Sequence, residues 1–165
     1  MATRALIGLG ANLGERELAL GRAWDLLGET PGIVLLRISP FHETEPMLHS
    51  PEIEQPMYLN AAGLLDAELS ARELLRAMLA IEQKLGRTRI KRWDARTMDL
   101  DLLLFGDLVL QSEELTVPHP LMTERRFVLE PAAQIAPDMI HPPTGKTVFQ
   151  LLADLRRLED KAFHG

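Results

Sequence analysis

The sequence predicts an α+β fold, in which a mainly antiparallel sheet carries helices packed on its faces. Three observations favour this class. Short apolar runs bounded by turn residues are typical of strands, longer segments repeat apolar residues every three or four positions as amphipathic helices do, and tight turns alternate with helix-length connections. Because no repeat and no long linker divides the 165 residues, we expect one domain over positions 1–165.

The amino-terminal half is predicted to contain three strands and one helix. The segments ALIGL (5–9) and IVLLRISPF (33–41) are interpreted as the first two strands. Between them, the apolar residues of segment 15–28 recur at spacings of three and four, which predicts a helix with one buried face. Three prolines in segment 42–57 indicate a long loop, and YLNAAGLLDA (58–67) is the third predicted strand.

The second predicted helix has the clearest boundaries. Ser70 and Glu73 have the spacing of a capping box, in which each side chain accepts a hydrogen bond from the backbone of the other residue. Apolar residues between positions 74 and 85 then follow one helical face. Gly86 is a natural residue to end the helix.

The carboxy-terminal half is predicted to contain a hairpin and a last helix. A strand holding Asp99 and Asp101, a tight turn at Gly106 and Asp107, and a return strand over 108–111 are expected to form the hairpin. Segment 115–131 is predicted to be extended and then helical. The last helix is expected to begin near Thr147 and to offer apolar residues for packing at Val148, Leu151, Leu152, Leu155 and Leu158.

Composition narrows the class of function. Apolar residues make up 46% of the chain and charged residues 25%, as in an ordinary soluble globular protein. No apolar run approaches the length of a membrane span and no signal-peptide pattern is present, so we expect a cytoplasmic protein without a membrane partner. A net charge of −6 disfavours general nucleic-acid binding, and the lack of cysteine excludes thiolate chemistry.

Asp99 and Asp101 are unexpected because they lie one residue apart in an otherwise apolar strand. Side chains alternate along a strand, so both carboxylates share a face, with Cα atoms about 6.6 Å apart. Two ionised carboxylates side by side repel one another and lose hydration unless a cation lies between them. The pair therefore predicts a cation site.

A basic cluster precedes this strand in a chain that is acidic overall. It consists of Lys84, Arg87, Arg89, Lys91, Arg92 and Arg96. An isolated run of this kind is more often a solvated charged loop. Beside an aspartate pair, however, arginines suit phosphate oxygens and carboxylates suit Mg²⁺, and a metal-bound polyphosphate needs both. Phosphoryl-type transfer with two metal ions becomes the leading chemistry.

Two other segments look like nucleotide-binding motifs but have the wrong spacing. GLGANLG (8–14) places its third glycine one residue too late for the dinucleotide fingerprint, and TGKT (144–147) has Ile140 where a P-loop needs its first glycine. We interpret both as turn chemistry.

Four blocks in the chain sharpen the prediction: LIGLGANLGER (6–16), QPMYLNAA (55–62), GRTRIKRWDARTMDLDLLLFG (86–106) and LTVPHPLMTERRFVLEPAAQIAP (115–137). In this order they resemble the 6-hydroxymethyl-7,8-dihydropterin pyrophosphokinase family of folate biosynthesis. The resemblance implies a ferredoxin-like α/β sandwich in which ATP donates its β,γ-diphosphate to the pterin hydroxymethyl group, releasing AMP. It also implies two Mg²⁺ per active site. We expect only small-molecule substrates, ATP and the dihydropterin, and a monomer.

The resemblance also assigns roles to individual residues. Asp99 and Asp101 match the metal ligands, and Arg87 and Arg96 match the arginines that act on the phosphates. The nucleotide positions are Glu82, Arg89, Trp93, Leu102, His119 and Arg125. The pterin positions are Thr44, Tyr58, Asn60 and Phe127, of which Tyr58 and Phe127 would stack on the ring. Without the resemblance, Tyr58 is interpreted equally well as a half-buried strand residue and Phe127 as core.

Some positions depart from the family pattern, and two alternatives stay open. The departures are Ala11, Glu45, Met47, Asp94, Ala95 and Glu114. The loops over 44–56 and 86–96 flank the inferred site, and we expect them to close on substrate. The alternatives are another magnesium-dependent nucleotidyl or phosphoryl transferase, and a non-catalytic ferredoxin-like binding module whose aspartates face solvent.

Overall fold

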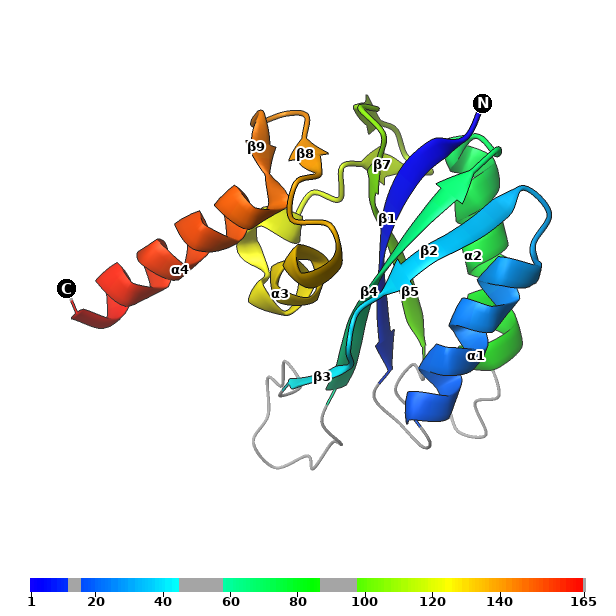
Figure 1. Ribbon diagram of the computed structural model, residues 1–165, viewed down its shortest axis with the longest axis horizontal. Helices are drawn as coiled ribbons and strands as arrows, with labels where there is room; N and C mark the ends of the chain where they lie inside the picture. Colours follow the sequence, from blue (N-terminus) through cyan, green and yellow to red (C-terminus); the bar gives the residue numbers. More distant parts are fainter. Residues whose placement is uncertain (12–15, 45–57, 87–97, 165) are drawn as a thin grey trace.

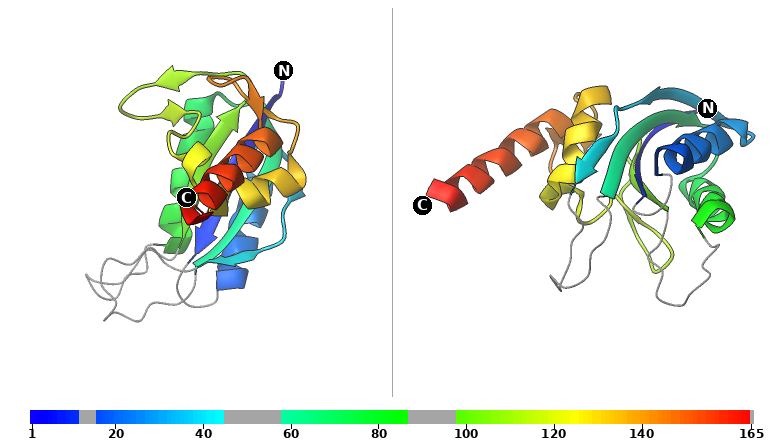
Figure 2. Two further views of the ribbon diagram at one scale, coloured as in Figure 1. Left: turned by 90° about the vertical axis from the view of Figure 1, so that its left-hand side faces the viewer. Right: turned by 90° about the horizontal axis from the view of Figure 1, so that it is seen from below.

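The computed structural model describes residues 1–11, 16–44, 58–86 and 98–164. A five-stranded antiparallel sheet lies between α1 and α2 on one face and α3 and α4 on the other (Figures 1 and 2). The predicted α+β, ferredoxin-like class is confirmed. The larger elements are β1 (Thr3–Ala11), α1 (Arg16–Glu29), β2 (Ile33–Ile38), β3 (His42–Thr44), β4 (Tyr58–Ala67), α2 (Ala71–Gly86), β5 (Asp99–Phe105), α3 (Arg126–Ile135) and α4 (Val148–His164).

Two apolar cores hold the layers together. The first packs α1 and α2 against one face of the sheet and includes Ile7, Leu65 and Leu102. The second packs α3 and the first turns of α4 against the other face and includes Leu6 and Leu104. Neighbouring residues of β1 therefore belong to different cores, as the period of two in a strand requires. In β5 this alternation is interrupted where its pairing with β1 shifts register, and Leu103 and Leu104 both belong to the second core.

The order of strands in the sheet is β2, β4, β1, β5, with β3 also paired to β4. All of these pairs are antiparallel. In Figure 1, β1 and β3 end, and β4 and β5 begin, at the lower end of the sheet. The first residues of β4 and β5 consequently lie at the same end as the last residues of β1 and β3.

The predicted second strand is divided in the structure. β2 ends at Ile38, and the chain then resumes beside the first residues of β4 as the short strand β3. Residues 42–44 were expected to begin a loop, so that part of the prediction is wrong. Between β2 and β3, Ser39 keeps the chain bound to β4. Its backbone N–H donates to the Ala62 carbonyl and its hydroxyl accepts from the Ala62 N–H, each at 2.9 Å. Pro40, which has no N–H to donate, follows at once.

The predicted hairpin after β5 is also wrong, although its turn is present. Gly106 adopts a φ of +54°, and the Leu108 N–H donates to the Phe105 carbonyl at 3.0 Å. The chain then forms β6 (Leu110–Gln111), which pairs with β7 (Thr116–Val117). β5 pairs with β1 instead, and in this place its leucines are buried in both cores.

The capping box predicted for α2 is confirmed. The Ser70 N–H donates to Glu73 Oε1 at 3.0 Å, and the Glu73 N–H donates to the Ser70 hydroxyl at 3.1 Å. These hydrogen bonds hold the pKa of Glu73 below its ordinary value. Glu114, one of the departures from the family pattern, forms ion pairs with two arginines of α2. Its carboxylate oxygens lie 3.6 Å from Nε of Arg72 and 3.5 Å from Nε of Arg76.

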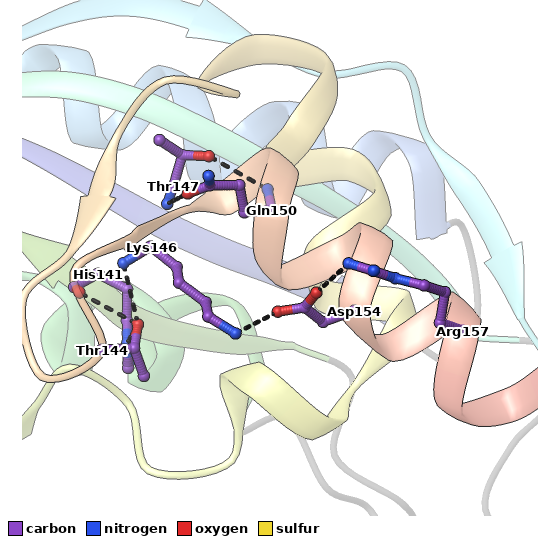
Figure 3. A network of polar contacts seen from close by, with 7 residues as sticks. All are labelled: His141, Thr144, Lys146, Thr147, Gln150, Asp154 and Arg157. Carbon is purple, nitrogen blue, oxygen red and sulfur yellow. Dashed lines mark hydrogen bonds and ion pairs between the residues drawn. The ribbon is translucent and has the colours of Figure 1, made fainter.

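A polar network anchors the start of α4 (Figure 3). The hairpin of β8 (Ile140–His141) and β9 (Lys146–Thr147) turns at Gly145, whose φ is +70°, so TGKT is a bend as predicted. Thr147 and Gln150 exchange hydrogen bonds of 2.8 and 3.1 Å as an N-terminal cap, and Lys146 pairs with Asp154. Further along α4, Leu158 is 65% exposed and does not pack as expected.

The described residues contain no helix that is both long enough and apolar enough to cross a membrane.

Candidate active site

Asp99 and Asp101 are the first and third residues of β5 and are both half-buried. Leu100 and Leu102, which alternate with them, belong to the core under α1 and α2. The two carboxylates therefore lie together on the opposite face, as the alternation of side chains along a strand predicts. Helix α3 covers this face only in part.

Two glycines of β1 lie beside the aspartates. Gly8 pairs with Asp101 and Gly10 with Asp99, and on its other side Gly10 pairs with Asn60 of β4. A Cβ atom added at Gly10 would lie 3.2 Å from Asn60 Oδ1 and 3.4 Å from Tyr58 Cε1. The side chains of Asn60 and Tyr58 thus pack directly against the backbone of Gly10, which has no side chain of its own. We missed this role in the sequence because the glycines of GLGANLG were interpreted only as turn residues.

Tyr58 and Asn60 occupy the start of β4 and share this face. The Tyr58 hydroxyl donates a hydrogen bond to Asp99 Oδ2 at 3.1 Å, while Asn60 is buried. The structure therefore brings two predicted pterin residues and the two predicted metal ligands into one cluster. Thr44 adds its backbone to the same end of the sheet, paired with Tyr58.

Arg125 and Phe127 meet at the start of α3, which packs on the face of the sheet that carries Asp99. The Arg125 guanidinium carbon lies 5.6 Å from the centroid of the Phe127 ring, within the range of a cation–π contact. His119 precedes them in the chain. Its backbone N–H donates to the Leu103 carbonyl, and its ring Nδ1 accepts from the backbone N–H of Leu121 at 3.3 Å.

Two predicted nucleotide residues lie toward the other face. The Leu102 side chain is buried in the core under α1 and α2, pointing away from the carboxylates. Glu82 is half-buried on α2, the helix that packs on that same face. The remaining predicted residues, Arg87, Arg89, Trp93 and Arg96, lie outside the described residues, as do the departures Glu45, Met47, Asp94 and Ala95 and most of both expected closing loops.

The site also includes a histidine that was not predicted. His42 of β3 pairs with Asn60, and its Nε2 lies 2.6 Å from Oε1 of Gln134 on α3. The hydrogen bond ties β3 to α3 beside the buried Asn60. The alternation of His42 with Thr44 was the available signal, but it was lost when this segment was interpreted as loop.

The donor set suits Mg²⁺. In the part of the chain that the structure describes, no three His, Cys, Asp or Glu side chains form a metal cluster. The donors available beside Gly8 and Gly10 are the carboxylates of Asp99 and Asp101. Mg²⁺ is commonly bound by one or two carboxylates and completes its shell with water and substrate phosphates. A pair of aspartates on an incompletely covered face fits that pattern.

Comparison with known proteins identifies the family. A family model for 7,8-dihydro-6-hydroxymethylpterin-pyrophosphokinase (HPPK) matches residues 6–137. The chain belongs to the HPPK family. An HPPK relative from Synechocystis sp. is 44% identical over 148 residues, covering 90% of this chain and 74% of the relative. One from Methylorubrum extorquens is 40% identical over 153 residues, covering 93% and 94%. Both are named 2-amino-4-hydroxy-6-hydroxymethyldihydropteridine pyrophosphokinase, which confirms the predicted class of enzyme.

Solved HPPK-DHPS structures share the fold. The wild-type Plasmodium falciparum structure with pteroate aligns with a TM-score of 0.76 and 12% identity, covering 100% of this chain and 46% of that one. A second, an HPPK-DHPS in complex with substrates, gives a TM-score of 0.74 at 12% identity and covers 100% and 45%. This chain thus spans less than half the length of those proteins, and the likeness concerns the HPPK fold alone.

Proposed function

We propose that this protein transfers the β,γ-diphosphate of ATP to the hydroxymethyl group of 6-hydroxymethyl-7,8-dihydropterin, giving the pterin diphosphate and AMP. The observation that carries the proposal is the cluster on one sheet face, where Tyr58 and Asn60 lie across Gly10 from Asp99 and Asp101. Membership of the HPPK family supports the same reaction.

The pterin would be held by stacking and by hydrogen bonds. Tyr58 and Phe127 offer aromatic faces, which suit a flat bicyclic ring. Asn60 offers an amide, which can both donate to and accept from the polar edge of the ring. Thr44, which pairs with Tyr58, completes the proposed pterin residues.

The nucleotide would be held on the carboxylate side of the cluster. Asp99 and Asp101 would bind two Mg²⁺, which when bound would neutralise charge on the transferring phosphates. Arg87 and Arg96 are proposed to stabilise the phosphate oxygens. The proposed nucleotide contacts include Arg89, Trp93, His119 and Arg125. Glu82 and the backbone at Leu102 are also proposed, with Glu82 on the helix that packs on the opposite face and the Leu102 side chain pointing to that face.

The reaction requires positioning more than a strong base. The pterin hydroxymethyl oxygen bonds to the β-phosphorus of ATP, while the bond from that phosphorus to the α,β-bridging oxygen breaks and its electron pair leaves with AMP. The hydroxyl proton passes to solvent. Tyr58 and Asn60 hold the attacking alcohol in line, and Arg87 and Arg96 stabilise the developing charge.

The decisive experiment measures AMP formation from MgATP with and without 6-hydroxymethyl-7,8-dihydropterin, with the pterin product identified by mass. We expect AMP and a pterin diphosphate only when both substrates are present. A folded protein that binds MgATP but releases no AMP in response to the pterin would favour another transferase. A folded protein that shows no Mg²⁺-dependent ATP binding would favour the binding module. Size-exclusion chromatography with light scattering tests the accompanying proposal of a monomer.

A further inference from the structure

We propose that Tyr58 is a positioning residue for Asp99, so that one side chain both supports the pterin and orients a metal ligand. The inference rests on the proposed function, but it adds a role for the phenol that stacking does not require. The Tyr58 hydroxyl donates to Asp99 Oδ2 at 3.1 Å.

The path of this hydrogen bond is unusual because the two residues are on strands that are not neighbours. Tyr58 begins β4 and Asp99 begins β5, and β1 lies between these strands in the sheet. Neighbouring strands are about 4.8 Å apart, so the two backbones are separated by roughly twice that distance. Only a long side chain lying across the intervening strand can join them.

Gly10 is what allows Tyr58 to cross β1. It is the β1 residue opposite Asp99, and a Cβ there would lie 3.4 Å from Cε1 and 3.7 Å from Cδ1 of the Tyr58 ring. The ring therefore lies directly over a backbone that has no side chain. A Cβ at position 10 would be in ordinary contact with the ring, and the atoms of a longer side chain would compete with the ring for space. The absence of a side chain at Gly10 therefore leaves the ring a clear path to Asp99.

The hydrogen bond has a direct consequence for cation binding. A carboxylate has two oxygens, and a phenol that donates to Oδ2 restricts the rotation of the group and so fixes the direction in which its oxygens point. Hydrogen bonds to the ligands of a metal orient them, and their loss commonly weakens metal binding by about 10- to 100-fold. Tyr58→Phe removes the hydroxyl and keeps the ring, so it separates the two roles of this side chain.

The test measures Mn²⁺ binding by electron paramagnetic resonance, with α,β-methylene ATP present and no pterin, so that turnover plays no part. We expect Tyr58→Phe to weaken Mn²⁺ binding roughly 10-fold or more, and to have no further effect in an Asp99→Asn background. Binding of a pterin analogue should survive in Tyr58→Phe and weaken in Tyr58→Leu. Thr30→Val, which removes a hydroxyl that donates to the Leu26 carbonyl on α1, is the control.

The outcomes separate this inference from the proposed function. If Asp99→Asn and Asp101→Asn abolish Mn²⁺ binding while Tyr58→Phe binds Mn²⁺ like the wild type, the positioning role is refuted and the proposed metal site stands. If the wild type binds no Mn²⁺, or if the aspartate variants bind it unchanged, the proposed metal site fails and the positioning role fails with it.

Discussion

Individual residues on one face of the sheet decide what the site can hold. Leu103 and Leu104 lie in the core beneath α3 and α4, whereas Asp99 and Asp101 lie beyond that cover and remain half-buried. The same strand can therefore carry core leucines at one end and carboxylates at the other. Gly8 and Gly10 leave the β1 backbone bare beside the carboxylates, which makes room for large side chains from β4.

Asp101→Ala should abolish magnesium-dependent turnover and leave the protein folded. Removing one of two neighbouring carboxylates relieves their repulsion in the metal-free protein, so the urea midpoint should stay the same or rise. Turnover assays and urea unfolding measure the two effects. Asp107→Ala, in the exposed turn after β5, is the matched control and should change neither. An Asp101→Ala protein that unfolds, or that retains near-normal turnover, would refute the assignment.

Gly10→Ala should raise KM for the pterin while the fold persists. The new methyl group would lie 3.2 Å from Asn60 Oδ1, closer than an ordinary contact, and would touch the Tyr58 ring at an ordinary distance. The Asn60 amide would therefore have to shift. Displacing one hydrogen bond of about 1.4 kcal/mol corresponds to a roughly tenfold weaker pterin interaction. Steady-state kinetics with each substrate varied in turn provides the measurement. Gly21→Ala on α1, where no atom lies within 4 Å of the added Cβ, should leave KM unchanged. Equal KM values for the pterin in the two variants would show that pterin binding does not depend on the space above Gly10.

At the scale of elements, the β8–β9 hairpin connects α3 to α4 and contains a buried histidine. His141 Nδ1 lies 2.8 Å from the Thr144 hydroxyl, and the Lys146 N–H donates to the same hydroxyl at 3.3 Å (Figure 3). Burial lowers the pKa of His141, because the charged imidazolium loses its hydration. Burial in this hairpin therefore favours the neutral form of the His141 imidazole.

This neutral imidazole predicts a pH dependence of stability. The unfolded histidine has a pKa of about 6.5, and the folded value is lower, so below that pH the unfolded chain binds more protons and is favoured. The stabilisation is complete above the unfolded pKa and is lost as the pH falls toward the folded value. The urea midpoint should decrease more between pH 7.5 and pH 5.5 for the wild type than for His141→Asn. Since the other histidines are common to both proteins, parallel profiles would exclude His141 as the cause.

At the scale of the whole molecule, two cores on opposite faces of one sheet provide the rigid frame. The site lies at one end of this frame, on the face where α3 and the start of α4 pack. Only the first turns of α4 belong to the second core, since Leu151 and Leu152 are buried and Leu158 is exposed. In Figure 1 the rest of α4 extends away from the sheet.

Two leucines of α4 should therefore respond differently to truncation. Leu152→Ala leaves a cavity in the second core and should lower the free energy of unfolding by about 2–5 kcal/mol. Leu158→Ala changes an exposed side chain and should stay within about 0.5 kcal/mol of the wild type. Denaturant unfolding compares them directly. A large loss in the Leu158 variant would mean that the outer part of α4 packs against something in solution.

Local patterns were enough for much of the fold and for part of the site. The strand over 58–67, the capping box of Ser70 and Glu73, and the shared face of Asp99 and Asp101 all follow from the sequence. Each depends on residues within a few positions of one another, where backbone periodicity and short-range hydrogen bonds dominate. The family resemblance added the class of enzyme, which the comparisons bear out.

What only the tertiary structure decided are the pairings between segments far apart in the chain. The strand after the basic segment pairs with β1 rather than with its neighbour in sequence, because in that place the helix layers cover both of its faces. β3 exists because β4 extends beyond the end of β2 and offers it a partner. The hydrogen bond from Tyr58 to Asp99 crosses a third strand at a glycine. No local pattern encodes that contact, since it depends on three strands that come together only when the sheet forms.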